Sequence, residues 1–267
     1  MTTLRVSDIE IYYEVHGRAL GEGDWVLNIG GTGGDLRQTF PDRSPLNDHF
    51  RVIHYDQRGL GRTSKPEVDY TMADYADDAA ALIEQVAGGR CHVVGTSFGG
   101  MVALNLAVRH PELVDRLVLL VTSPGGDHAS YALPELQLLD PAEAFTTRMR
   151  LLDERWDPDA EEPIPGLGAI YEFIVQQQQA VAPPHVQAGL DRQLAARDGH
   201  DVVAALGTID LPTFVGAGRY DGLAPAANSE VLAERMPDAR LEMFEGGHLV
   251  MFQDGRVWPA VIDFLSR

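Results

Sequence analysis

Three side chains in this sequence have the types and positions that nucleophilic catalysis requires. Ser97 stands in the middle of a Gly-x-Ser-x-Gly pentapeptide, Asp221 lies in Gly-Arg-Tyr-Asp-Gly, and His248 ends Glu-Gly-Gly-His. A serine hydroxyl becomes a nucleophile when a histidine takes its proton, and a carboxylate can hold that histidine in the required tautomer. These residue types therefore point to attack on a carbonyl carbon.

The segments on either side of Ser97 predict how it is held. Residues 91–95 are apolar and include two valines, which is typical of a buried strand, and residues 98–110 are helix formers that end before Pro111. A strand that turns sharply into a helix needs the flanking glycines, because side chains there would clash. The hydroxyl would then lie at a helix N-terminus, which favours negative charge. The alternative is a glycine-rich turn that only packs helix on strand.

The other elements must bring Asp221 and His248 to the serine. The pattern predicts strands within 4–16 (a hairpin or pair) and at 25–29, 51–55, 91–95, 116–121, 213–217 and 240–244, and helices at 71–87 with Thr71 as N-cap, 98–110, 226–236 and 257–265. Such alternation predicts a parallel sheet covered by helices on both faces. Asp221 and His248 come just after two late strands, where an open parallel sheet places its active site.

Each partner of Ser97 also has a simpler interpretation. Asp221 could be only a turn former or helix cap, and His248 a structural histidine. The rival acids Asp198, Asp201 and Asp210 are weaker candidates, because they precede their strand instead of following it. Asp56 and Arg58, after the strand at 51–55, are expected to brace the turn that follows them.

Between residues 122 and 206 the alternation stops. Prolines punctuate short helical pieces, such as 142–156 and 168–181, so we expect a mostly helical cap inserted into a core made of residues 1–121 and 207–267. Three aromatic residues of this segment are expected to be mainly core, with some lining a pocket: Trp156, Tyr171 and Phe173.

Composition excludes several classes of protein. The 267 residues carry 40 Asp and Glu against 21 Lys and Arg, a net charge of −19 that repels nucleic acid and anionic membranes. No apolar run reaches the length of a membrane span, and no apolar stretch follows Met1, so neither a membrane helix nor a secretory signal is expected. The single cysteine, Cys91, fits a strand core in a reducing cytoplasm. The histidines lack metal-ligand spacing, so no metal is expected.

These motifs together resemble the α/β-hydrolase superfamily over nearly the whole chain. The matching pieces are GTSFGG, DQRGLGRTS, GRYDGLAP and GGHLVMFQ, and the order Ser, Asp, His is that of this superfamily. The resemblance implies a mostly parallel eight-stranded sheet with helices on both faces and a helical cap insertion. More narrowly, NIGGTGGDLRQTF followed by YDQRGLGRTS is similar to the enol-lactonase and small-ester hydrolase group.

The resemblance also implies a mechanism. Ser97 attacks a carbonyl, His248 takes its proton, Asp221 fixes the imidazole, and backbone N–H groups stabilise the oxyanion. We expect these donors to be Phe98 and Gly31, with Gly30 as second choice. One departure from the family is that Ile29 or Asn28 stands where the histidine of the usual His-Gly at this loop would be. Residues 30–35, Gly-Gly-Thr-Gly-Gly-Asp, fail the dinucleotide-binding pattern, because Leu36 stands where its third glycine is needed.

The predicted function is hydrolysis of a small-molecule ester or lactone without a cofactor. The alternatives are C–C bond hydrolysis, lyase or perhydrolase chemistry on the same triad, or a non-catalytic protein that binds a small ligand. No nucleic acid or membrane partner is expected, and a homodimer is left open.

Overall fold

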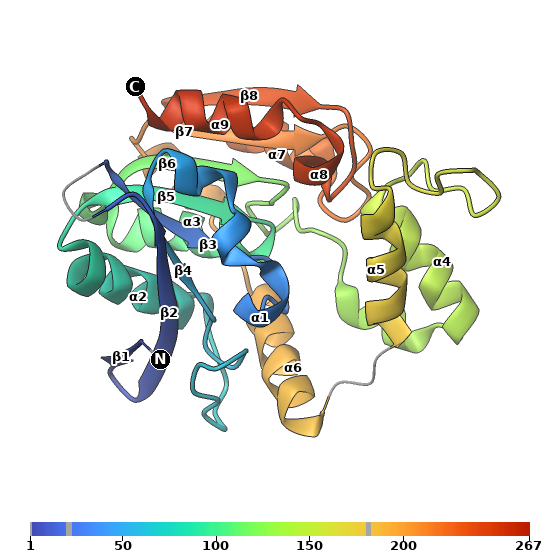
Figure 1. The fold of residues 1–267 in the computed structure, drawn as a ribbon, viewed down its shortest axis with the longest axis horizontal. Coiled ribbons are helices and arrows are strands. Elements are labelled where there is room, and N and C mark those ends of the chain that lie inside the picture. Colours follow the sequence, from blue (N-terminus) through green and yellow to red (C-terminus); the bar gives the residue numbers. More distant parts are fainter. Residues whose placement is uncertain (1, 20–22, 180–182) are drawn as a thin grey trace.

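The core of the computed structural model, which describes residues 2–19, 23–179 and 183–267, is one eight-stranded sheet (Figure 1). Its strands are β1 (Thr3–Val6), β2 (Ile9–Gly17), β3 (Trp25–Ile29), β4 (Arg51–Tyr55), β5 (Cys91–Thr96), β6 (Val114–Leu120), β7 (Thr213–Gly218) and β8 (Ala239–Phe244). They lie in the order β1-β2-β4-β3-β5-β6-β7-β8. The β1–β2 and β2–β4 pairs are antiparallel and the other pairs are parallel, as the sequence predicts.

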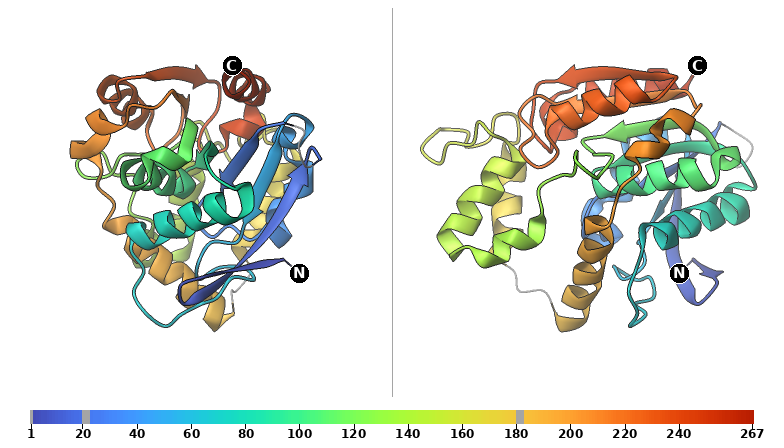
Figure 2. Two further views of the ribbon diagram at one scale, coloured as in Figure 1. Left: turned by 90° about the vertical axis from the view of Figure 1, so that its left-hand side faces the viewer. Right: turned by 180° about the vertical axis from the view of Figure 1, so that it is seen from behind.

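Both faces of this sheet are buried, which explains why its central strands are mostly apolar and do not alternate with polar residues. Successive side chains of a strand point to opposite faces. Val93 therefore belongs to the buried cluster that includes residues of helices α2 (Met72–Leu82), α3 (Phe98–Arg109) and α7 (Ala226–Arg235), while Val94 belongs to the cluster that includes residues of α9 (Val257–Leu265). The right-hand view of Figure 2 shows α2, α3 and α7 on one face, and Figure 1 shows α9 on the other.

Helix α2 begins where its sequence predicts. Thr71 accepts a hydrogen bond from the Asp74 N–H, and the Asp74 carboxylate accepts one from the Thr71 N–H, so both ends of a capping box are present. The last turn, η3 (Ile83–Ala87), is a π-helix, and it stops at Gly88, which adopts the left-handed conformation (φ 82°). The predicted helix 71–87 is therefore confirmed as one continuous element.

Three longer helices follow β6 in the sequence and lie beyond the carboxyl ends of the strands (Figure 1). They are α4 (Pro141–Leu152), α5 (Ala169–Gln179) and α6 (Pro184–Asp198). Shorter helical segments complete the fold: α1 (Leu36–Thr39), η1 (Pro41–Arg43), η2 (Pro45–Asp48), η4 (Pro111–Leu113), η5 (Leu133–Leu138), η6 (Val203–Thr208) and α8 (Val250–Gln253). That residues 122–206 act as a cap stays a prediction.

Within this helical segment two details differ from expectation. Helix α4 ends at Leu152 instead of Trp156, because Asp153 has an extended backbone and its carboxylate binds the Arg155 guanidinium. The expectation that Phe173 is core is wrong, since 44% of its surface is exposed. Trp156 and Tyr171 are partly buried and share a hydrogen bond. The end of the predicted helix 168–181 lies outside the described residues.

Cys91 is buried in β5, where burial raises the pKa of its thiol to about 12. It therefore stays protonated and is a poor nucleophile. Within the described part of the chain, no helix is long and apolar enough to cross a membrane. The same residues contain no group of three or more His, Cys, Asp or Glu side chains arranged to hold a metal.

Candidate active site

The turn between β5 and α3 holds Ser97 in a conformation that few residues adopt. Its φ is 54° and its ψ is −119°, so the backbone is strained. A Cβ on Gly95 would collide with the Gly99 carbonyl, and one on Gly99 with the Ile29 carbonyl, so both glycines are required sterically. The Ser97 N–H donates to the Leu120 carbonyl (2.9 Å), which fixes the turn to β6. The predicted strand–turn–helix geometry is confirmed.

Ser97, His248 and Asp221 form one chain of hydrogen bonds. The Ser97 Oγ lies 2.9 Å from His248 Nε2, and His248 Nδ1 lies 2.8 Å from Asp221 Oδ2. A carboxylate can only accept, so Nδ1 carries the proton and Nε2 is free to accept from the serine hydroxyl. Ser97 is half-buried, whereas Asp221 and His248 are buried.

The loops that carry Asp221 and His248 are fixed by their own hydrogen bonds. The second oxygen of Asp221, Oδ1, accepts from the N–H groups of Leu223 (2.9 Å) and Ala224 (2.8 Å). The His248 N–H donates to the Leu152 carbonyl at the end of α4, 2.7 Å away. The imidazole therefore takes its position from the helical segment after β6 as well as from the sheet.

A further link between these regions runs through Gln253. Its Oε1 accepts from the Gly247 N–H, and its Nε2 donates to Asp153 Oδ2 and to the Pro165 carbonyl, each at 2.8 Å. One amide side chain thus joins the histidine loop to two points of the segment between β6 and β7. Gln253 ends the matching piece GGHLVMFQ, but sequence reasoning gave it no role, since a glutamine in a helical stretch does not show what it will bind.

The glycine loop, residues 30–35, lies beside the serine. An added Cβ on Gly31 would be 3.6 Å from Ser97 Cβ, which is ordinary contact. Within the described residues, the N–H groups of Phe98, Gly30, Gly31 and Thr32 donate to no protein acceptor. Phe98 directly follows the serine, and Gly31 is the loop residue that lies next to it, so the N–H groups of both are close to Ser97. They are therefore free to bind an oxygen.

Three side chains from elsewhere hold the glycine loop. Gln57 Nε2 donates to the Gly30 carbonyl (2.8 Å), and Gln193 Oε1 accepts from the Gly33 N–H (2.8 Å). Asp56, fully buried, accepts from the Leu36 N–H at 2.7 Å just past the loop.

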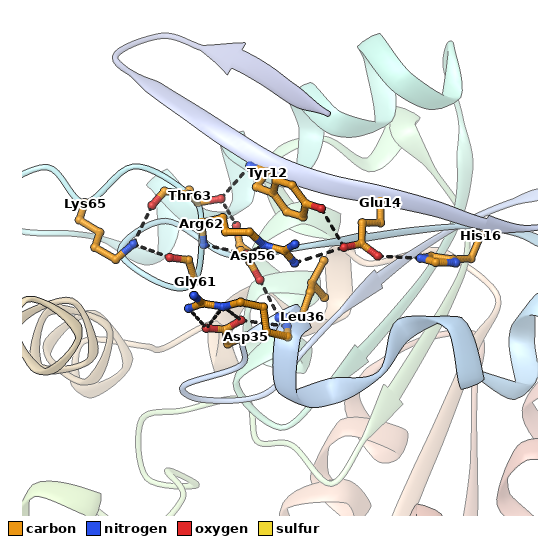
Figure 3. A network of polar contacts seen from close by, with 11 residues as sticks. Tyr12, Glu14, His16, Asp35, Leu36, Asp56, Gly61, Arg62, Thr63 and Lys65 are labelled. Atoms are coloured by element: carbon orange, nitrogen blue, oxygen red, sulfur yellow. Dashed lines mark hydrogen bonds and ion pairs between the residues drawn. The ribbon is translucent and has the colours of Figure 1, made fainter. Parts of the chain in front are cut away.

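Figure 3 shows the Asp56 carboxylate between Leu36 and Arg62. The backbone N–H of Arg62 also donates to this carboxylate (2.8 Å). Arg58 pairs with buried Asp78 on α2 (2.7 and 2.8 Å). The prediction that Asp56 and Arg58 brace the turn after β4 is thus confirmed. The rival acids Asp198, Asp201 and Asp210 make no hydrogen bond to His248 in the described structure.

Comparison with known proteins identifies the family. The model for the α/β-hydrolase fold matches residues 24–157. The proposed carbamate hydrolase RutD of Agrobacterium fabrum is 31% identical, over 90% of this chain and 92% of that protein. Its counterpart in Variovorax paradoxus is 32% identical over 96% of each chain. The chain belongs to the α/β-hydrolase family.

Solved structures agree with this assignment. A hydrolase from Pseudomonas aeruginosa superposes with a TM-score of 0.78 at 28% identity, covering all of this chain and 98% of that one. The enol-lactonase of Burkholderia xenovorans superposes with a TM-score of 0.81 over both whole chains, and its 22% identity shows a shared fold alone. Both the sequence relatives and the solved structures are hydrolases, and the protein is a hydrolase of the α/β-hydrolase fold.

Proposed function

We propose that this enzyme is a cofactor-free serine hydrolase that cleaves a small ester, lactone or carbamate through an acyl-enzyme on Ser97. The observation that carries the proposal is the continuous hydrogen-bond chain from Ser97 Oγ through His248 to Asp221. The names of the relatives add the carbamate, which has the same kind of electrophilic carbonyl as an ester. Helices α4–α6 are proposed to act as the cap over this site.

The first half of the reaction forms the acyl-enzyme. Ser97 Oγ bonds to the carbonyl carbon as its proton passes to His248 Nε2, and the carbonyl π electrons move onto oxygen. The N–H groups of Phe98 and Gly31 would stabilise that oxyanion, and losing one such donor typically costs about 3 kcal/mol. When the tetrahedral intermediate collapses, the bond to the leaving group breaks and His248 gives it the proton.

The second half releases the acid. Water attacks the acyl carbon while His248 Nε2 takes its proton, and collapse of the second intermediate returns that proton to Ser97 Oγ. Asp221 stays ionised throughout and stabilises the imidazolium that forms twice. Each proton has an acceptor among these residues, so the chain's own side chains complete the cycle.

Labelling with a fluorophosphonate tests the proposal. The intact mass should increase by one adduct, and peptide mapping should place it on Ser97. Ser97→Ala should take no label, and His248→Ala should react far more slowly, while Ser130→Ala serves as a control at a serine whose hydroxyl donates to Ser123. No adduct on the wild-type protein, or an adduct elsewhere, would contradict an activated Ser97.

Turnover of p-nitrophenyl acetate then separates the proposal from C–C bond hydrolysis on the same triad. Hydrolysis of this ester supports acyl transfer. Turnover of a β-diketone with no turnover of esters would favour C–C cleavage instead.

A further inference from the structure

The glycine loop has little internal structure to fix its backbone. Four of its six residues are glycine, which loses more conformational freedom on folding than any other residue. Within the loop the described hydrogen bonds include one between backbone groups, from the Gly34 N–H to the Gly31 carbonyl at 3.2 Å. The direction of its N–H groups must therefore be set from outside.

Gln57 acts on the peptide unit that contains the proposed oxyanion donor. Its Nε2 donates to the Gly30 carbonyl. This carbonyl and the Gly31 N–H belong to one planar trans peptide, in which they point in opposite directions. Holding the carbonyl oxygen toward Gln57 therefore turns the Gly31 N–H away from it.

Gln193 reaches the same loop from α6. Its side chain is fully buried, and its Oε1 accepts from the Gly33 N–H. Helix α6 lies tightly against this part of the core, because a Cβ on Gly189 would collide with the Gly59 carbonyl. Leu190 is 3.7 Å from the place that a Cβ on Gly33 would occupy. The loop therefore moves only if α6 moves with it.

Each of these two amides has one buried polar end without a described partner, which destabilises the fold. The far end of each, Gln57 Oε1 and Gln193 Nε2, is buried without a hydrogen-bond partner among the described residues. A buried polar atom without a partner destabilises a fold, so an apolar side chain would pack these positions better. The useful end of each amide is the one that binds the loop.

We propose that Gln57 and Gln193 are positioning residues for the oxyanion donor: Gln57 orients the Gly31 N–H, and Gln193 couples that orientation to the placement of α6. This inference rests on the proposed function. The chemistry differs at the two sites, because Gln57 must donate to a carbonyl whereas Gln193 must accept from an N–H.

That difference defines the variants. Gln57→Met removes the donor and Gln193→Met removes the acceptor, each with nearly the same side-chain length. Gln193→Glu keeps an acceptor oxygen in either protonation state and should restore the wild-type behaviour. Gln187→Met, on the same helix, is the matched control, because the Gln187 side chain donates to Asp191 of α6 and has no described hydrogen bond to the loop.

Kinetics on p-nitrophenyl acetate give the first readout. Gln57→Met should lower kcat by about 100-fold with KM changed less than about twofold, as expected for loss of a transition-state donor. Gln193→Met should lower kcat by about 10-fold, and Gln193→Glu and Gln187→Met should stay within about threefold of wild type. Wild-type kcat in Gln57→Met, or equal losses in Gln193→Met and Gln193→Glu, would overturn the inference.

Amide hydrogen exchange of the peptide covering residues 28–36 gives a readout that does not need activity. Exchange should accelerate in Gln57→Met and Gln193→Met but not in Gln193→Glu or Gln187→Met, at unchanged Tm. Failure of the proposed function shows instead as absent labelling of wild-type Ser97, so the two failures are distinguishable. Unchanged loop exchange in both Met variants would refute the positioning role, whether or not Ser97 takes the label.

Discussion

Two glycine-rich turns lie side by side at the carboxyl ends of β3 and β5, and they are held in different ways. The turn at Ser97 is fixed by steric exclusion against backbone, since Gly95 touches Gly99 and Gly100 of its own turn and Gly99 touches the Ile29 carbonyl of β3. The glycine loop is fixed by side chains from remote segments, including Gln193, which is 160 residues from the Gly33 that it binds. The comparison teaches that glycine content alone does not say whether a turn is rigid by itself.

The largest expected effect is loss of turnover when the nucleophile at the Ser97 turn is removed. Ser97→Ala should lower kcat by about 10⁶-fold, because no other group can form the acyl-enzyme. Alanine lacks only the hydroxyl, so the backbone at φ 54° and the urea midpoint should change little. Ester turnover under saturating substrate and urea unfolding measure the two quantities. Substantial residual turnover would show that a residue other than Ser97 is the nucleophile.

The second effect concerns the imidazole. Asp221→Asn should lower kcat by about 10⁴-fold, because the amide favours the wrong tautomer of His248. Asp198→Asn is the matched control, since this acid at the end of α6 makes no described bond to His248. A near-normal kcat in Asp221→Asn, or equal damage in both variants, would point to a different acid.

A pair of alanine substitutions compares the two turns directly. Gly99→Ala places a Cβ against the Ile29 carbonyl and should destabilise the fold by about 3 kcal/mol, at the upper end of overpacking effects. Gly31→Ala meets only ordinary contacts and should change the unfolding free energy by less than about 1 kcal/mol. Urea unfolding measures both. Similar losses in the two variants would remove the distinction between a sterically fixed turn and a loop held from outside.

Two buried histidines, His54 and His200, allow a prediction of how the stability of the fold depends on pH. His54 bonds Asn28 at the end of β3, and His200 bonds Asn105 on α3 and the Ser123 carbonyl. Burial lowers the pKa of each imidazole to about 4. Between about pH 6.5 and pH 4 the unfolded chain binds protons that the folded chain does not. Stability should therefore fall as pH falls through this window, by about 1.4 kcal/mol per unit for each histidine.

Unfolding free energies measured across this window test that prediction. His200→Gln should remove the share of the pH slope due to His200, whatever its effect at neutral pH. His185→Gln, at an exposed position of α6, is the matched control. An unaltered slope in His200→Gln would show that this imidazole is not kept neutral by the fold.

Much of this protein followed from local sequence. The helix at 257–265 has the bounds that its pattern predicts, and the helix at 71–87 begins at its predicted cap. The turn at Ser97 could be predicted because its glycines, strand and helix are contiguous in the sequence, whereas the contact of Gly99 with the Ile29 carbonyl is visible only in the fold. The order of Ser97, Asp221 and His248 along an alternating pattern was enough to expect them at one edge of the sheet.

Other features depended on contacts between distant segments. Helix α4 ends at Leu152, where the next residue, Asp153, binds Gln253 from the other end of the chain, and Phe173 is exposed although its segment predicted core. Gln57 and Gln193 could not be singled out, since a glutamine acquires a role only from the backbone group that folding brings to it. The sequence by itself determined the reactive side chains and the elements that carry them. Only the tertiary structure decided which side chains hold the glycine loop, because those hydrogen bonds join residues that no local pattern relates.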